Sequence, residues 1–68
     1  MKYAELKRRL TQLGCRKVKE GARHEIWERV STGATTLLSR HDSQESPPGT
    51  LANILKQLGI SRDEFGHV

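Results

Sequence analysis

The chain has 68 residues, of which 12 are Lys or Arg and 8 are Asp or Glu, so its net charge is +4. A chain of this length forms one domain, residues 1–68, and leaves no room for a separate cofactor-binding domain. Its single cysteine excludes an intramolecular disulfide bond, and no apolar run resembles a signal peptide or a membrane span. We therefore expect a small cytoplasmic protein.

The positive charge lies in the N-terminal half of the chain. Residues 1–29 contain nine Lys or Arg and four Glu, whereas residues 30–68 contain three Lys or Arg and four acidic residues. The positive electrostatic potential of these residues would raise the local concentration of a polyanion such as RNA around the first half of the chain. Solvation of a small domain explains the same charges equally well.

The first predicted element is a helix over residues 3–13. Tyr3, Leu6, Leu10 and Leu13 recur at helical spacing and form a narrow apolar stripe, and Gly14 ends the helix. The cationic row of residues 7–9 is most simply a solvated helix face, with RNA contact as the second interpretation.

Three short strands are predicted next, over residues 15–20, 24–30 and 34–39, with turns at 21–23 and 31–33. Because the turns are short, the strands should form an antiparallel meander. Alternation in the middle strand puts His24, Ile26 and Glu28 on one face and Glu25, Trp27 and Arg29 on the other. Each face carries one large apolar residue, so the pattern leaves open which face meets the helices. The single tryptophan is expected to anchor the core or an interface rather than to stack on a base.

A polar loop over residues 40–49 ends in Pro47-Pro48-Gly49 and leads to a second helix. Apolar residues at 51, 54, 55 and 58 define that helix, Gly59 ends it, and Ile60 suits a Schellman contact. The segment 61–64 has the form of a capping box that opens one more helical turn. The order predicts an α+β fold in which both helices cover one face of a three-stranded antiparallel sheet, similar to the double-stranded-RNA-binding fold.

The sequence lacks the motifs that most cofactors require. The cysteine and the three histidines lack zinc-site spacing, and no phosphate-binding glycine loop is present, so we expect neither a metal nor a cofactor. RNA cleavage remains possible because the 2′-hydroxyl of RNA is an internal nucleophile. The protein then needs only a proton-transfer group and a cation that stabilises charge on the phosphoryl oxygens.

His24 is the candidate proton-transfer group, and Arg23, Lys17 and Lys19 are candidate phosphate contacts around it. A surface histidine bonded to a backbone carbonyl is the structural alternative.

Arg40 and His41 directly follow the third predicted strand and are further candidate contacts to RNA. A solvated loop histidine is the alternative for His41. His67 lies beside the C-terminus and is assigned no role.

Four segments, taken in order, resemble the HicA toxins, also called the YcfA-like family. They are the opening helix ending at Leu13-Gly14-Cys15, the segment Gly21-Ala22-Arg23-His24, the strand end Leu38-Ser39-Arg40-His41, and the closing helix 49–60. The resemblance implies a double-stranded-RNA-binding-like fold, an mRNA interferase with His24 as its catalytic histidine, and inhibition by a HicB antitoxin. Two features depart from the family pattern: Ala22 replaces a common serine, and the loop 42–46 is acidic where lysines are frequent.

Two other classes of function fit the same residues. A non-catalytic RNA-binding module would use the basic surface without cleaving RNA. A pure interaction protein would use the uncovered sheet face or edge to bind another protein.

Overall fold

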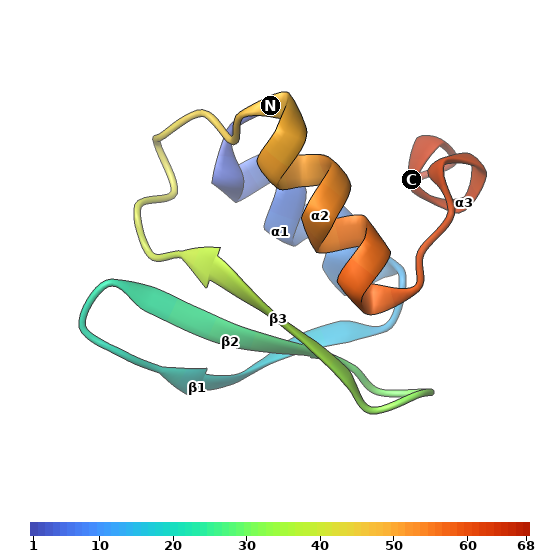
Figure 1. Cartoon of the computed structure of the whole chain (residues 1–68), viewed down its shortest axis with the longest axis horizontal. Coiled ribbons are helices and arrows are strands. Elements are labelled where there is room, and N and C mark those ends of the chain that lie inside the picture. The colour runs from blue at the N-terminus through green and yellow to red at the C-terminus, as the bar shows by residue number, and fades with distance from the viewer.

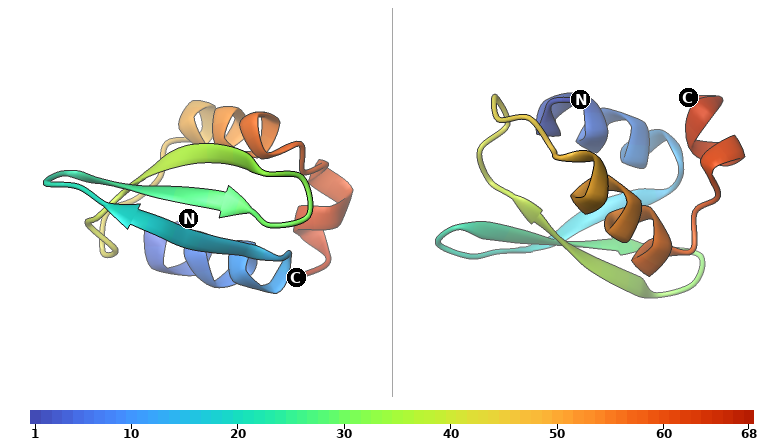
Figure 2. Two further views of the ribbon diagram at one scale, coloured as in Figure 1. Left: turned by 90° about the horizontal axis from the view of Figure 1, so that it is seen from below. Right: turned by 45° about the horizontal axis from the view of Figure 1, so that its top comes forward.

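The computed structural model describes residues 1–68 and has the element order α1-β1-β2-β3-α2-α3 (Figure 1). The strands β1 (Cys15–Glu20), β2 (His24–Arg29) and β3 (Ala34–Ser39) form one antiparallel sheet in the order β1-β2-β3. Helices α1 (Tyr3–Gln12) and α2 (Pro48–Leu58) lie on one face of that sheet, α1 beside β1 and α2 beside β3, and the opposite face is bare (Figure 2). The predicted α+β architecture is confirmed.

The ends of the elements follow from local chemistry. Helix α1 stops before Gly14, whose φ of 84° is left-handed. Strand β2 ends at Arg29, one residue earlier than expected, because the Arg29 carbonyl already accepts the turn hydrogen bond from Gly33 N at 2.8 Å. Helix α2 begins at Pro48, where proline fixes a helical φ and needs no hydrogen-bond partner for its nitrogen.

The C-terminal segment matches its predicted caps. The N–H of Ile60 donates to the Leu55 carbonyl at 2.9 Å after the left-handed Gly59, as in a Schellman motif. Ser61 and Glu64 then form a capping box that starts the short helix α3 (Arg62–Gly66).

The core lies between the helices and the inner face of the sheet. Alternation along β2 turns Glu25 and Trp27 toward the helices, and His24 toward the bare face. The expectation that Trp27 belongs to the core is confirmed, since it is 7% exposed. The buried apolar cluster consists of Tyr3, Leu6, Leu10, Cys15, Trp27, Leu38, Ile54, Leu55, Leu58, Ile60 and Phe65.

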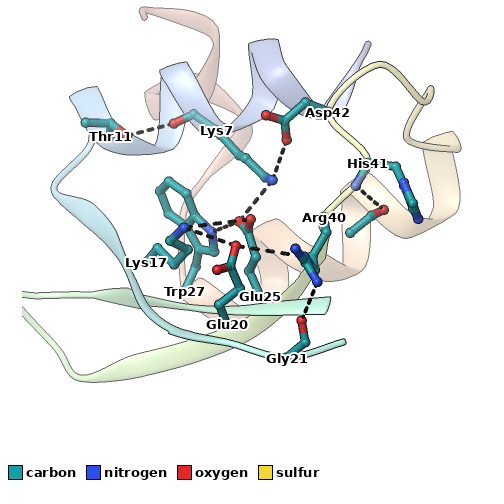
Figure 3. Close-up of polar contacts among 11 residues, drawn as sticks. Lys7, Thr11, Lys17, Glu20, Gly21, Glu25, Trp27, Arg40, His41 and Asp42 are labelled. Carbon is teal, nitrogen blue, oxygen red and sulfur yellow. Dashed lines mark hydrogen bonds and ion pairs between the residues drawn. The ribbon is translucent and has the colours of Figure 1, made fainter. Parts of the chain in front are cut away.

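A buried ion pair joins α1 to the middle strand (Figure 3). Lys7 Nζ lies 2.9 Å from Glu25 Oε1, and both side chains are about one-tenth exposed. Trp27 Nε1 donates to the same carboxylate oxygen at 2.9 Å, and Lys7 Nζ donates to Asp42 Oδ1 at 2.5 Å. The interpretation of residues 7–9 as one solvated row is therefore wrong for Lys7. Position 7 lies one helical turn from Tyr3 and Leu10 and so belongs to the inner side of α1.

The two charges stabilise each other against the cost of burial. Burial would raise the pKa of the Glu25 carboxyl, but the bonds from Trp27 and Lys7 outweigh it and hold this pKa below its ordinary value of 4.5. Burial would lower the pKa of Lys7, but the bonds to Asp42 and Glu25 raise it above 10.5. Because folding lowers the pKa of Glu25, its contribution to stability is present above pH 4.5 and is lost as the pH falls through the folded value.

We expect Lys7→Met to lower the free energy of unfolding by about 3 kcal/mol at neutral pH, because it leaves the Glu25 carboxylate buried without its main counter-charge. Arg8→Met is the matched control, since Arg8 is about half exposed on the same helix. Urea unfolding followed by circular dichroism measures both. The deficit of Lys7→Met should shrink as the pH falls through the range in which Glu25 is protonated. Equal losses for the two variants would contradict the assignment.

Candidate functional site

A pocket of about 270 Å³ opens on the bare face of the sheet beside the β1–β2 turn, and His24 forms part of its wall. His24 is the first residue of β2 and lies opposite Ser39 of β3. The remaining walls combine cationic, small and apolar residues: Lys19, Gly21, Ala22, Arg23, Ile26 and Leu37. Three of the predicted site residues, His24, Arg23 and Lys19, are thus brought together.

A β-bulge brings Lys19 to this face. The register of β1 against β2 shifts between Lys17, which lies opposite Trp27, and Lys19, which lies opposite Ile26. Strict alternation would place both lysines on the same face of the sheet, but the extra residue Val18 turns Lys19 to the other face. Lys19, Ile26 and Leu37 therefore form one row across the bare face.

Lys17 lies away from the pocket. Its Nζ lies on the helix side of the sheet, 3.5 Å from Glu20 Oε1 and 4.0 Å from Glu25 Oε2 (Figure 3). His41 is exposed in the loop after β3, and its backbone N–H donates to Ser39 Oγ at 3.1 Å. Neither residue lines the pocket with His24.

Arg40 holds the turn that carries His24 (Figure 3). Its Nη1 donates to the backbone oxygens of Gly21 and Ala22 at 3.1 and 3.0 Å, and its Nε lies 3.8 Å from Glu20 Oε1. The Gly21 N–H closes the turn onto the His24 carbonyl at 2.8 Å. The guanidinium predicted to contact RNA is engaged within its own chain.

Gly21 allows a close approach of the backbone inside this turn. A Cβ at position 21 would lie 3.2 Å from the backbone oxygen of His24, which is tighter than most carbon–oxygen contacts of a side chain. A side chain at position 21 would require the backbone at His24 to shift by a few tenths of an ångström.

Two cations beside His24 have no acidic partner. Seven of the twelve Lys and Arg side chains lie within 4.0 Å of a carboxylate. Arg8 and Arg9, for example, both bind Glu5 and hold the pKa of that carboxyl at about 2. The cations that lack such a partner are Lys2, Lys19, Arg23, Lys56 and Arg62. The pocket therefore gathers Lys19 and Arg23 with charge available for an anion.

The acidic loop after β3 neutralises charges elsewhere in the molecule. Asp42 binds Lys7, and Glu45 Oε2 lies 2.7 Å from the N-terminal amino group of Met1. The backbone oxygens of Asp42 and Gln44 also accept from the first N–H groups of α1, both at 3.0 Å. These carboxylates fasten the loop to α1 and do not line the His24 pocket.

Sequence reasoning did not single out Ile26 and Leu37, which complete the pocket. Alternation places the apolar Ile26 on the same face as His24, which could have pointed to the pocket. Alternation alone did not show that this face is the bare one. Leu37 is 59% exposed, more than any other large apolar side chain of the protein. Elsewhere, no group of three or more His, Cys, Asp or Glu side chains is placed to hold a metal ion. None of the helices is long and apolar enough to cross a membrane.

Fold and pocket together define a small α+β domain that presents a histidine and two available cations on a bare sheet face. The family model for the HicA toxin of bacterial toxin–antitoxin systems matches residues 3–60, from α1 through α2. The chain belongs to the HicA toxin family, which makes it a toxin with an antitoxin as its partner. No curated protein and no solved structure matched the chain.

We expect Arg40→Ala to speed hydrogen exchange at the Gly21 amide, because the variant removes both hydrogen bonds that hold the turn carbonyls. Arg62→Ala is the control, since Arg62 is an exposed arginine without an acidic partner. Exchange followed by NMR measures the effect at single amides. Unchanged exchange at Gly21 in Arg40→Ala would contradict this role of Arg40.

Proposed function

We propose that this toxin is a metal-independent endoribonuclease that cleaves mRNA in the cytoplasm, arrests growth and is neutralised by a HicB-like antitoxin. The observation that carries the proposal is that His24 lines one pocket together with Lys19 and Arg23, two cations that lack an acidic partner. Membership of a toxin family supports a harmful activity rather than a structural role.

The proposed reaction uses the RNA 2′-hydroxyl as its nucleophile. The 2′-oxygen loses its proton and attacks the adjacent phosphorus, while the bond from phosphorus to the 5′-oxygen breaks and that oxygen gains a proton. The products are a 2′,3′-cyclic phosphate and a 5′-hydroxyl end. His24 serves as general base or general acid, because histidine as a residue type exchanges protons near neutral pH.

Lys19 and Arg23 supply the cations that this reaction requires. Negative charge accumulates on the phosphoryl oxygens in the transition state, and cationic donors held in place there stabilise it. Both side chains are available because no carboxylate of the chain neutralises them. Ile26 and Leu37 add an apolar surface beside them, against which a base next to the cleaved phosphate can lie.

The pocket favours single-stranded RNA. It is a surface depression of about 270 Å³, smaller than a typical small-molecule site, so only part of an RNA chain can enter it. A single strand can turn its bases toward such a surface, whereas the bases of a duplex are paired with each other. A flexible message segment therefore suits this site.

His24→Ala should lower the rate of RNA cleavage by about 100-fold or more, because a positioned general acid or base contributes about 10²–10⁴-fold. Denaturing gels of a labelled transcript measure the rate, and the fragments should carry 5′-hydroxyl ends. His67→Ala is the control for loss of a histidine, since His67 is exposed at the far end of the chain. Wild-type cleavage should persist in EDTA.

The same experiment separates the enzyme from a non-catalytic RNA-binding module. A binding module predicts no cleavage by the wild type and salt-sensitive RNA binding that persists in His24→Ala. Equal cleavage by wild type and His24→Ala would remove His24 from the reaction.

Lys19→Ala should weaken RNA binding about tenfold and reduce the slope of log K against log salt by about one, as expected for one lost phosphate contact. Lys17→Ala is a matched control, because it removes the same type of side chain from the same strand but from the helix side of the sheet. Fluorescence anisotropy over a series of salt concentrations measures both variants. A larger effect of Lys17→Ala would contradict the proposed pocket.

A further inference from the structure

The two edges of the sheet differ in their protection. Strand β1, at one edge, has the sequence CRKVKE, with four charged residues and a β-bulge. Charged side chains and bulges are the features by which natural sheets prevent another strand from adding to an edge. Strand β3, at the other edge, has the sequence ATTLLS and pairs with β2 in an unbroken register without any charged residue. The β3 edge is therefore unguarded.

The backbone of β3 presents unused hydrogen-bonding groups at this edge. In an antiparallel ladder, alternate residues of a strand bond to one neighbour and the others point away from it. The bond from Arg40 N to the Arg23 carbonyl, at 3.3 Å, shows which residues of β3 bond to β2: Arg40 does, and so does every second residue before it. Thr35, Leu37 and Ser39 consequently direct their N–H and C=O groups outward.

A groove of about 600 Å³ runs beside the same edge, between β3 and α2. Its α2 wall consists of four uncharged residues, Thr50, Asn53, Ile54 and Gln57. The sheet side is uncharged as well, and it includes Ile26 and Leu37. The groove therefore suits an extended segment whose backbone bonds to the β3 edge and whose side chains along the groove are uncharged.

The groove is continuous with the His24 pocket. Ile26 and Leu37 line both hollows, so a segment at the β3 edge can reach the pocket across these two side chains. In the His24 pocket, Lys19 and Arg23 have no acidic partner. Charge complementarity therefore requires an acidic side chain where the bound segment meets the pocket. A second copy of β3 does not meet this requirement, because residues 31–41 contain no carboxylate and include Arg40.

We infer that the antitoxin binds by adding an extended segment to the β3 edge, with uncharged residues along the groove and an acidic residue against Lys19 and Arg23. This mode of recognition is β-strand addition, in which backbone hydrogen bonds supply affinity and pockets for alternate side chains supply specificity. That such a segment would also block the reaction rests on the proposed function of the His24 pocket. The strand addition itself rests on the edge and the groove.

Hydrogen exchange tests the inference directly. The toxin is measured alone and in complex with a HicB-like antitoxin that neutralises it, amide by amide, by NMR. Exchange at Thr35, Leu37 and Ser39 should slow by about 100-fold or more in the complex. On β1, the bonds from Gly21 N to the His24 carbonyl and from Val30 N to the Gly14 carbonyl leave the amides of Lys17 and Glu20 pointing away from β2, and exchange there should change little. Unchanged exchange on β3 would overturn the inference. Protection of β3 in the toxin alone, at the mass of a dimer, would also overturn it, since a second copy would then occupy the edge.

A pair of variants isolates the backbone contribution. Thr35→Pro removes an outward N–H that makes no bond to β2, and Thr35→Val keeps that N–H while removing the hydroxyl. Thr35→Pro should weaken antitoxin binding about tenfold or more in calorimetry, and Thr35→Val should leave it nearly unchanged. Equal affinity of the two variants would overturn the inference. If circular dichroism shows that Thr35→Pro is unfolded, the exchange experiment decides.

RNA cleavage by the same proteins keeps the two proposals distinguishable. Thr35 does not line the His24 pocket, so both variants should cleave RNA at the wild-type rate. If the wild type does not cleave RNA, the proposed function fails, while calorimetry and hydrogen exchange still decide how the antitoxin binds.

Discussion

The buried ion pair between Lys7 and Glu25 joins helix α1 to the middle strand of the sheet (Figure 3). Glu25 turns inward because Lys7 and the Trp27 indole satisfy its carboxylate there. Since neighbouring residues of a strand point to opposite faces, an inward Glu25 requires an outward His24. The burial of Trp27 and the ion pair of Glu25, both on the other side of the sheet, thus set the orientation of the candidate proton-transfer group.

The same lysine links the site to the loop after β3. Lys7 also binds Asp42, and two residues earlier Arg40 reaches back to the carbonyls of the β1–β2 turn. The turn that carries His24 is consequently held from α1 through the loop as well as by its own hydrogen bond from Gly21 to His24. This arrangement explains how a domain with so small a core can give a surface histidine a defined position.

The ion pairs divide the basic side chains into those that are paired with a carboxylate of the chain and those that are free to bind an external anion. Along α1 and the helix side of the sheet, the basic residues are matched by Glu5, Glu20, Glu25 and Asp42. On the bare face, Lys19 and Arg23 are not matched. A net charge of +4 spread over the chain would attract any polyanion, but unmatched charge beside one histidine directs that attraction to a particular place.

The helices and strands and their order could be predicted from the sequence alone. Apolar spacing, the glycines at 14, 33 and 59, and the 61–64 capping box act over a few residues, and these local signals predicted two helices and a three-stranded meander. It also singled out His24, Lys19 and Arg23, because the chemistry of an anion site needs those residue types.

Contacts across the fold set which side of the sheet each residue faces and which cations remain available. The inner face of β2 depends on whether Trp27 or Ile26 packs under the helices, and alternation is the same in both cases. The bulge at Val18 separates Lys19 from Lys17, and pairing across the fold engages Lys7 and Arg40. These outcomes arise from contacts between residues far apart in the chain, and no local pattern records them.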